Sequence, residues 1–388
     1  MSEFVDGNRI TLLTRGLEYF PQLEAACDAA RREIHIETYI YDEDESGERI
    51  GAALKRAAQR GVATHVLVDG YGSKRLSPGF IKDLERAGVK FLIYRQERTA
   101  LVMGRRRLRR MHRKVAVIDA RIAFIGGINI IDDMHTPGHT PPRVDYAVRV
   151  EGPLLRHIYP AVKRLWALVE FLQLGADWHN ALALKADAGT QGTQRAAFVI
   201  RDNLRHRRDI EDAYLEAIAA ARSEIIIANA YFFPGLSFRR ALSDAAARGV
   251  RVTLLLQGRV EYVLLHYASR ALYGALLDAG ICITEYHKSF LHAKVAVIDG
   301  VWATVGSSNI DPFSLLLARE ANVVVQDRAF AGELRARLVT AMADGAREVQ
   351  PENWRAQPLA LRIATWVAYG VARFLTGVFA YGRAREFN

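Results

Sequence analysis

The chain has 388 residues, of which 50% are hydrophobic and 25% are charged. This composition is typical of a globular protein with one or two sizeable cores and excludes a disordered chain. Lysine and arginine (53) outnumber aspartate and glutamate (43), and the resulting net charge of +10 suits a polyanionic partner, either nucleic acid or an anionic membrane surface.

The N-terminal end, MSEFVDGNRITLL, contains no basic segment followed by an apolar one. It therefore predicts no signal peptide and a cytoplasmic site of action. The two cysteines, Cys27 and Cys282, do not have the spacing of metal ligands and are expected to be core thiols in a reducing compartment.

Helices and strands alternate along the chain. Residues 46–61 have the apolar spacing of a helix that ends at Gly61, and an apolar, β-branched strand is expected over 62–69. The pattern begins again near residue 209, after a stretch rich in small and polar residues, 174–197, which is expected to be a linker with some helical content. This alternation predicts α/β layers.

The sequence also contains an internal repeat. Four segments of the first half recur in the same order in the second half, at offsets of 180 to 192 residues. They are RREIHIETYI (31–40) with ARSEIIIANAY (221–231), AAQRGV (57–62) with AAARGV (245–250), RAGVKFLIY (86–94) with DAGICITEY (278–286), and HRKVAVID (112–119) with HAKVAVID (292–299). We therefore predict a duplicated domain, with copies at 1–173 and 198–350 and a separate tail at 351–388.

The repeat that carries chemistry is H-x-K-x4-D. Residues two apart in a strand project from the same face, so His112 shares a face with Lys114, and His292 with Lys294. A single motif of this kind would more often be an ordinary surface strand. Two of them at equivalent positions of a duplicated domain indicate one paired site.

Two histidines and two lysines that face each other suit the cleavage of a phosphodiester. The ammonium groups supply positive charge for an anionic group in a partly desolvated cleft. One imidazole can attack phosphorus while the other protonates the leaving oxygen and then acts as a base, through a phosphohistidine. Because the lysines balance the developing charge, neither a metal nor another cofactor is predicted.

H-x-K-x4-D followed by GGxN or GSxN, twice in one chain, resembles the phospholipase D superfamily over nearly the whole sequence. The resemblance implies an α/β, phospholipase D-like fold in which two pseudo-equivalent mixed-sheet halves pack with the active site at their interface. It implies catalytic histidines, phosphate-binding lysines and asparagines, and downstream carboxylates that orient each histidine. The matching positions are His112, Lys114, His292 and Lys294, with Asn129 and Asn309 for the phosphate and Asp145 and Glu320 as the orienting carboxylates.

Two aspartates, Asp119 and Asp299, complete the catalytic motifs, and the resemblance implies a mainly structural role for them. In other members the N-terminal motif often supplies the nucleophile. By that resemblance His112 is assigned as the nucleophile and His292 as the acid and base.

Longer segments, including 109–130 and 302–325, resemble bacterial cardiolipin synthases of the B type. This implies transfer of a phosphatidyl group from one phospholipid, typically phosphatidylglycerol, to phosphatidylglycerol or glycerol, with release of glycerol. The expected partners are anionic phospholipids at the cytoplasmic face of a bacterial inner membrane.

The alternatives to this function are a phosphodiesterase acting on nucleic acid, a phospholipid hydrolase and an inactive membrane-binding scaffold. The apolar tail disfavours nucleic acid.

Two regions predict contact with a membrane independently of the motifs. Residues 104–114, GRRRLRRMHRK, carry seven cations that would attract anionic headgroups, the alternative being a solvated loop or a nucleic-acid contact. The apolar segment 359–385 is interrupted by Arg362 and Arg373, which share a helix face. No apolar run reaches the roughly 20 residues that span a bilayer. We predict an in-plane amphipathic helix, the alternative being a helix packed on the protein's own core.

Overall fold

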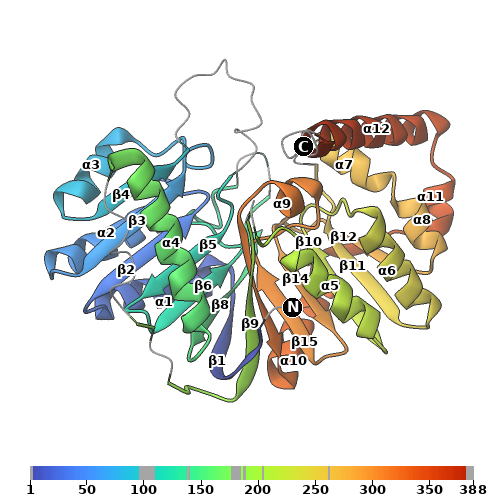
Figure 1. Ribbon diagram of the computed structural model, residues 1–388. Helices are drawn as coiled ribbons and strands as arrows, with labels where there is room; N and C mark the ends of the chain where they lie inside the picture. Colours follow the sequence, from blue (N-terminus) through green and yellow to red (C-terminus); the bar gives the residue numbers. More distant parts are fainter. Residues whose placement is uncertain are drawn as a thin grey trace.

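The two predicted copies form two α/β halves that stand side by side and share one sheet (Figure 1). β1 of the first half and β9 of the second lie next to each other at the centre of the molecule. The computed structural model describes residues 3–95, 110–136, 138, 140–175, 185–186, 189–202, 205–260 and 263–381.

Within these described residues, the large sheet has 15 strands, and β7 and β13 form a second sheet. The strands are β1 (Val5–Thr14), β2 (Glu33–Thr38), β3 (Ala63–Asp69), β4 (Lys90–Tyr94), β5 (Lys114–Ile118), β6 (Ile122–Gly126), β7 (Arg143–Val144), β8 (Tyr146–Glu151), β9 (Gln194–Arg201), β10 (Glu224–Asn229), β11 (Arg251–Gln257), β12 (Cys282–Tyr286), β13 (Phe290–Leu291), β14 (Lys294–Ile298), β15 (Trp302–Gly306), β16 (Glu320–Gln326) and β17 (Ala346–Glu348).

The order of the strands is mirrored about the β1–β9 pair. It runs β1-β8-β6-β5-β2-β3-β4 in the first half and β9-β16-β15-β14-β10-β11-β12 in the second, with β17 added at the edge. β2, β3 and β4 are parallel, as are β10, β11 and β12, whereas the motif strands β5 and β14 run antiparallel to their neighbours. The predicted duplication is therefore visible in the topology.

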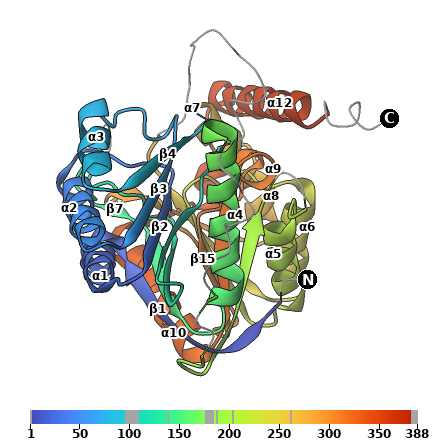
Figure 2. The same ribbon diagram turned by 60° about the vertical axis from the view of Figure 1, so that its left-hand side comes forward.

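Helices cover both faces of the sheet. They are α1 (Arg15–Ala29), α2 (Glu45–Gln59), α3 (Pro78–Arg86), α4 (Leu155–Leu174), α5 (Asp209–Ala220), α6 (Leu236–Ala247), α7 (Val263–Arg270), α8 (Tyr273–Asp278), α9 (Pro312–Leu316), α10 (Arg328–Gly345), α11 (Pro351–Arg355) and α12 (Leu359–Tyr381). In the first half, α1 to α3 lie on one side of the strands and α4 on the other (Figure 2).

The core explains why the halves do not separate. Each half has an outer core beneath its own helices, and a third, central core contains residues of both halves. In this central core, Val115 and Val148 of the first half belong to the same cluster as Val295 and Val323 of the second, with Leu334 of α10. The motif strands are thus held together by shared apolar burial.

Most predicted elements are confirmed near their expected bounds. The predicted helix 46–61 is α2, where the Asp44 side chain accepts a hydrogen bond from the Gly47 N–H as an N-cap. The predicted strand 62–69 is β3. The expected linker 174–197 is shorter than predicted, because β9 already begins at Gln194. Residues 176–184 and 187–188 of that stretch lie outside the described residues.

The tail forms α11 and then α12, which packs along α7 (Figures 1 and 2). One face of α12 is buried against the second half, with Thr365 4% and Ala372 2% exposed and Tyr369 in ring contact with Phe233. Among the described residues, no helix combines the length and the apolar character needed to cross a bilayer.

Candidate active site

Both candidate histidines lie at the edge of the sheet where the parallel strands end. The carboxyl ends of β2 and β3, and of β10 and β11, are the usual ligand-binding edge of an open α/β sheet. Because β5 and β14 run antiparallel to β2 and β10, they begin at that edge. His112 and His292 come two residues before β5 and β14 begin, so the twin motifs bring both imidazoles there.

Backbone hydrogen bonds between the halves hold the two motifs together. The His112 N–H donates to the Arg319 carbonyl (2.9 Å), and the Arg319 N–H donates to the Arg110 carbonyl (2.8 Å). On the other side, the His292 N–H donates to the Val144 carbonyl (2.8 Å), and β7 pairs with β13 in parallel. Each histidine is therefore attached to the segment that carries the carboxylate of the other half.

The orienting carboxylates follow the same crossed arrangement. The His112 Nδ1 lies 3.0 Å from the Glu320 Oε1 and 3.2 Å from its Oε2, and the His292 Nδ1 lies 2.6 Å from the Asp145 Oδ2. The carboxylates are buried, whereas the histidine side chains are 17% and 13% exposed. A carboxylate on Nδ1–H leaves Nε2 free to face a substrate.

Both motif lysines are buried beside their histidines, with Lys114 2% and Lys294 0% exposed. The Lys114 Nζ donates to the His112 carbonyl (2.6 Å), and the Lys294 Nζ donates to the His292 carbonyl. The Lys294 Nζ also lies 3.7 Å from the Asp145 Oδ2. Two ammonium groups in so little solvent form a strongly positive site for one anionic group.

Burial and mutual repulsion shift the pKa values of these groups. Burial, with Lys294 adding to it, lowers the pKa of His292 to about 3, and burial also lowers the pKa of His112. Burial lowers the pKa of Lys114 to about 7, with Glu320 opposing the shift. Burial alone would raise the pKa of Asp145, but Lys294 and the hydrogen bond from His292 outweigh it and hold that pKa below its usual value. Both imidazoles are therefore neutral at pH 7.

The two asparagines assigned to the phosphate are buried at the same edge, with Asn129 3% and Asn309 4% exposed. The Asn129 Oδ1 accepts a hydrogen bond from the Ile40 N–H (3.0 Å), which leaves its Nδ2 as the donor for a ligand. Within the described part of the chain, the Asn309 Oδ1 has no hydrogen-bond partner.

Asp119 and Asp299, which the motif groups with the catalytic residues, lie at the far ends of β5 and β14. Seven positions of extended chain separate each of them from its histidine, roughly 20 Å. Asp119 accepts hydrogen bonds from the backbone N–H groups of residues 31, 32 and 33, and Asp299 from those of residues 222, 223 and 224. They hold the turns that enter β2 and β10, so direct catalysis by either aspartate is excluded and the structural interpretation is retained.

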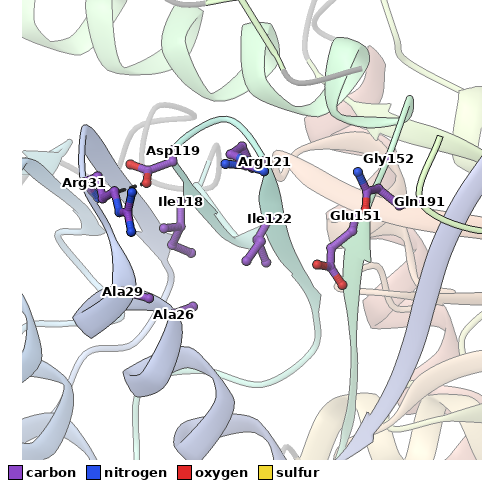
Figure 3. Close-up of a pocket in the computed structure, with 10 residues that line it drawn as sticks. All are labelled: Ala26, Ala29, Arg31, Ile118, Asp119, Arg121, Ile122, Glu151, Gly152 and Gln191. Atoms are coloured by element: carbon purple, nitrogen blue, oxygen red, sulfur yellow. Dashed lines mark hydrogen bonds between the residues drawn. The ribbon is translucent and has the colours of Figure 1, made fainter. Parts of the chain in front are cut away.

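A cavity of about 340 Å³ surrounds Asp119 at this far end (Figure 3). Arg31 and Arg121 line it together with Glu151 and Gln191. The close-up shows the Asp119 carboxylate directed toward Arg31, whose backbone N–H donates a hydrogen bond to it. The chemistry of the twin motifs is therefore not located in this cavity.

Sequence reasoning missed the partner of Glu320. The Ser307 Oγ donates to the Glu320 Oε2 (2.5 Å). The equivalent residue of the first copy is Gly127, where a Cβ atom would lie 2.2 Å from the Asp145 Oδ1. In the first half, the Asp145 carboxylate thus occupies the space that a side chain at Gly127 would need. In the second half, the Glu320 carboxylate instead accepts a hydrogen bond from the Ser307 hydroxyl. The difference between GGxN and GSxN was the available signal.

Two tyrosines also border the site. The Tyr39 ring contacts His112 edge-on at 4.8 Å between centroids, with the Lys114 Nζ 5.3 Å from the Tyr39 centroid. Tyr231 takes the corresponding position at 6.4 Å from His292. Each half thus places one tyrosine ring against its own motif histidine.

The basic segment 104–114 is only partly described, because residues 104–109 lie outside the described residues. Arg113 was counted among the cations available to headgroups, and that prediction was wrong. Arg113 is 3% exposed, and its guanidinium donates to both oxygens of Glu37 and to the Ala161 carbonyl. Arg113 and Glu37 therefore form a buried ion pair with a structural role. Arg110 lies 3.7 Å from Asp69.

The chain is similar to known proteins over most of its length. The chain matches the family described as "Cardiolipin synthase, PLD-like domain" over residues 23–136 and 214–341. It is 43% identical over 356 residues to cardiolipin synthase B of Escherichia coli (strain K12), covering 89% of this chain and 83% of that one. It is 31% identical over 316 residues to a cardiolipin synthase of Geobacillus kaustophilus, covering 81% and 62% respectively.

Solved structures show the same fold at low sequence identity. A phosphatidylserine synthase of Haemophilus influenzae has a TM-score of 0.70 at 12% identity and covers 95% of this chain and 94% of its own. A polyphosphate kinase of Porphyromonas gingivalis has a TM-score of 0.56 at 15% identity, over 96% of this chain and 53% of its own.

The matching family model and the two pseudo-equivalent halves identify a phospholipase D-like enzyme, as predicted. Within that class, the chain belongs to the cardiolipin synthase family. It is a phosphatidyltransferase of that family.

Proposed function

We propose that the protein synthesises cardiolipin by transferring the phosphatidyl group of one phosphatidylglycerol to the headgroup of another, with release of glycerol. The observation that carries this proposal is the crossed site, in which two neutral imidazoles and two buried lysines surround one position for a phosphodiester. The names of the relatives at 43% and 31% identity support the substrate class.

The reaction takes two balanced steps. In the first, the nucleophilic imidazole Nε2 attacks phosphorus, and the bond from phosphorus to the glycerol oxygen breaks. The other imidazole, His292, gives that oxygen its Nε2 proton, while the Lys294 ammonium passes a proton to the His292 Nδ1, so that this imidazole stays neutral. In the second, the His292 Nε2 removes the proton of an acceptor hydroxyl, and the Nδ1 proton returns to Lys294. The acceptor oxygen attacks phosphorus, and the phosphorus–nitrogen bond breaks. Lys114 and Lys294 stabilise the negative charge in both steps.

The surroundings of the two Nδ1 atoms support the assignment of His112 as the nucleophile. Among the described residues, the hydrogen-bond partners of the His112 Nδ1 are the two Glu320 oxygens, which are acceptors, so its proton stays there and Nε2 keeps a lone pair. The His292 Nδ1 lies between an acceptor, Asp145, and a donor, the Lys294 Nζ at 2.8 Å. An imidazole that can hold its proton on either nitrogen suits acid and base catalysis.

Helix α12 supports a peripheral position on an anionic membrane. The face opposite its buried side carries exposed apolar residues, namely Leu359, Ile363, Trp366, Val367, Val371 and Phe374. Arg362 and Arg373 are exposed along one border of this face. An apolar stripe with cations at its border is typical of a helix that lies in the plane of the headgroups. The expected surface is the cytoplasmic face of a bacterial inner membrane.

The end of α4 adds a second apolar surface, with Phe171 50%, Leu172 70% and Leu174 69% exposed. The Gln173 side chain donates to the Ile93 carbonyl (2.7 Å), near the end of β4 at the site edge. α7, on which α12 packs, follows β11 at the corresponding edge of the second half. Both surfaces would thus contact the membrane that supplies the substrate.

The test is to incubate the protein with labelled phosphatidylglycerol vesicles and, separately, with single-stranded DNA. Cardiolipin formation that disappears in His112→Ala and His292→Ala supports the proposal. DNA cleavage without lipid turnover would instead identify a nucleic-acid phosphodiesterase, and release of phosphatidic acid alone a hydrolase. His206→Ala is a matched control, because His206 is a surface histidine bonded to Asp209.

A further inference from the structure

Gln257 ends β11 at the site edge of the second half and is 7% exposed. Within the described residues, neither its Nε2 nor its Oε1 has a hydrogen-bond partner. Most buried side-chain polar groups have at least one partner, and an orphaned amide destabilises the fold. A side chain with both amide atoms unpaired therefore needs an explanation.

Gln257 lines a small cavity of about 30 Å³, enough for one or two groups the size of a water molecule. Its other walls include Tyr231, Arg259, His266, Ser269 and Tyr273. Arg259 is already bonded to the His287 carbonyl and to Thr140. The Gln257 amide therefore lines this cavity with both of its polar atoms unpaired among the described residues.

In the first half, the side chain at the position equivalent to Gln257 has hydrogen-bond partners within the protein. The residue equivalent to Gln257 is Asp69, at the end of β3. Its carboxylate accepts hydrogen bonds from the backbone N–H groups of Tyr71, Gly72 and Met111. The duplicated fold therefore satisfies this position internally in one copy and leaves it unsatisfied in the other.

The cavity also adjoins the reaction site. Tyr231, which forms part of its wall, contacts the His292 ring at 6.4 Å between centroids. His292 is the imidazole assigned to deprotonate the acceptor hydroxyl. A group held by Gln257 would consequently lie on the acceptor side of the site.

We propose that Gln257 forms a subsite for a second hydroxyl of the acceptor, so that the enzyme selects a polyol headgroup over an alcohol with one hydroxyl. The amide oxygen accepts from this hydroxyl and the amide N–H donates to it, while the reacting hydroxyl of the same headgroup faces His292. The inference rests on the proposed phosphatidyl transfer and specifies its acceptor.

The test measures transfer from labelled phosphatidylglycerol vesicles to free glycerol and to 1-propanol, as the ratio of the two kcat/KM values. In Gln257→Leu, which has a similar volume and no hydrogen-bonding group, the ratio of glycerol to propanol falls by about tenfold. Gln257→Asn keeps the amide but withdraws it by one methylene, and it gives a smaller loss. Thermal melting of each variant accompanies the assay.

A matched control is Gln326→Leu, the same change at an exposed position that ends β16, which leaves the ratio unaltered. If Gln257→Leu also leaves the ratio unaltered, the cavity holds only water and the subsite is refuted. If the unmodified enzyme transfers to neither alcohol and makes no cardiolipin, the proposed function fails as well, and that result is recognised before any variant is compared.

Discussion

His112 and Glu320 lie 208 residues apart in the chain, yet the Nδ1 of the first is 3.0 Å from the Oε1 of the second. His292 and Asp145 repeat the arrangement at 2.6 Å in the opposite direction. Each half therefore supplies the imidazole of one pair and the carboxylate of the other. Neither half contains a complete pair, which explains why the motif occurs twice in one chain.

Removing the charge of either carboxylate should lower kcat far more than it changes KM. Glu320→Gln keeps the shape of the side chain but no longer fixes the His112 proton on Nδ1, so we expect kcat to fall by about 100-fold or more. Asp145→Asn should act in the same way through His292. Steady-state kinetics with phosphatidylglycerol in mixed micelles measures both constants.

Glu216 provides the matched control for this experiment, because it is exposed on α5 away from the site. Glu216→Gln should retain full activity. A Glu320→Gln enzyme with unchanged kcat would show that the crossed pair has no role in the reaction. A Glu320→Gln enzyme altered only in KM would assign Glu320 to substrate binding instead.

Covalent trapping should label His112. Because the described partners of the His112 Nδ1 are the two Glu320 oxygens, which accept its proton, the His112 Nε2 is the expected attacking atom. Because the phosphorus–nitrogen bond is labile in acid, the reaction of the enzyme with labelled phosphatidylglycerol is quenched in a detergent denaturant at neutral pH. Peptide mass spectrometry should then place the phosphatidyl group on the peptide around His112. His292→Ala should slow both formation and breakdown of the adduct. An adduct mapped to His292 would reverse the two roles.

The sequence allowed the fold class, the duplication and the identity of the paired residues to be predicted, because apolar periodicity and the repeated motif are local signals. The crossing of the carboxylates could not be predicted in this way. It depends on Arg319 and Val144 pairing with the chain upstream of the opposite histidine, and such contacts leave no local pattern. The prediction that Arg113 is available to lipid headgroups was wrong for a related reason, since its partner Glu37 is 76 residues away in the chain.

Gly127 should tolerate no side chain. A Cβ atom there would lie 2.2 Å from the Asp145 Oδ1, so Gly127→Ala must displace the carboxylate that orients His292. We expect kcat to fall by about tenfold or more, together with a lower melting temperature. Calorimetry and kinetics on the same preparation separate the two effects.

The control for this substitution is Gly332→Ala in α10, where an added Cβ would meet nothing within 4 Å. It should leave kcat unchanged and stabilise the fold by about 0.5–1 kcal/mol, because alanine is the better helix former. Equal kinetics for the two alanine variants would contradict the close contact between Gly127 and Asp145.

The alkaline limb of the activity profile should report Lys114. With its pKa lowered to about 7, Lys114 loses its charge as the pH rises through that value. We therefore expect kcat/KM for the anionic substrate to decline by up to about tenfold per pH unit above pH 7.

The free energy of unfolding should change with pH in the opposite direction. Between pH 7 and the ordinary lysine pKa near 10.5, the unfolded chain binds a proton that the folded chain does not, so the free energy of unfolding rises with pH in this window. Denaturant titrations of the wild type and Lys114→Met isolate this contribution, because the variant lacks the group. A kcat/KM that stays flat to about pH 9 would show that Lys114 keeps its proton in the free enzyme.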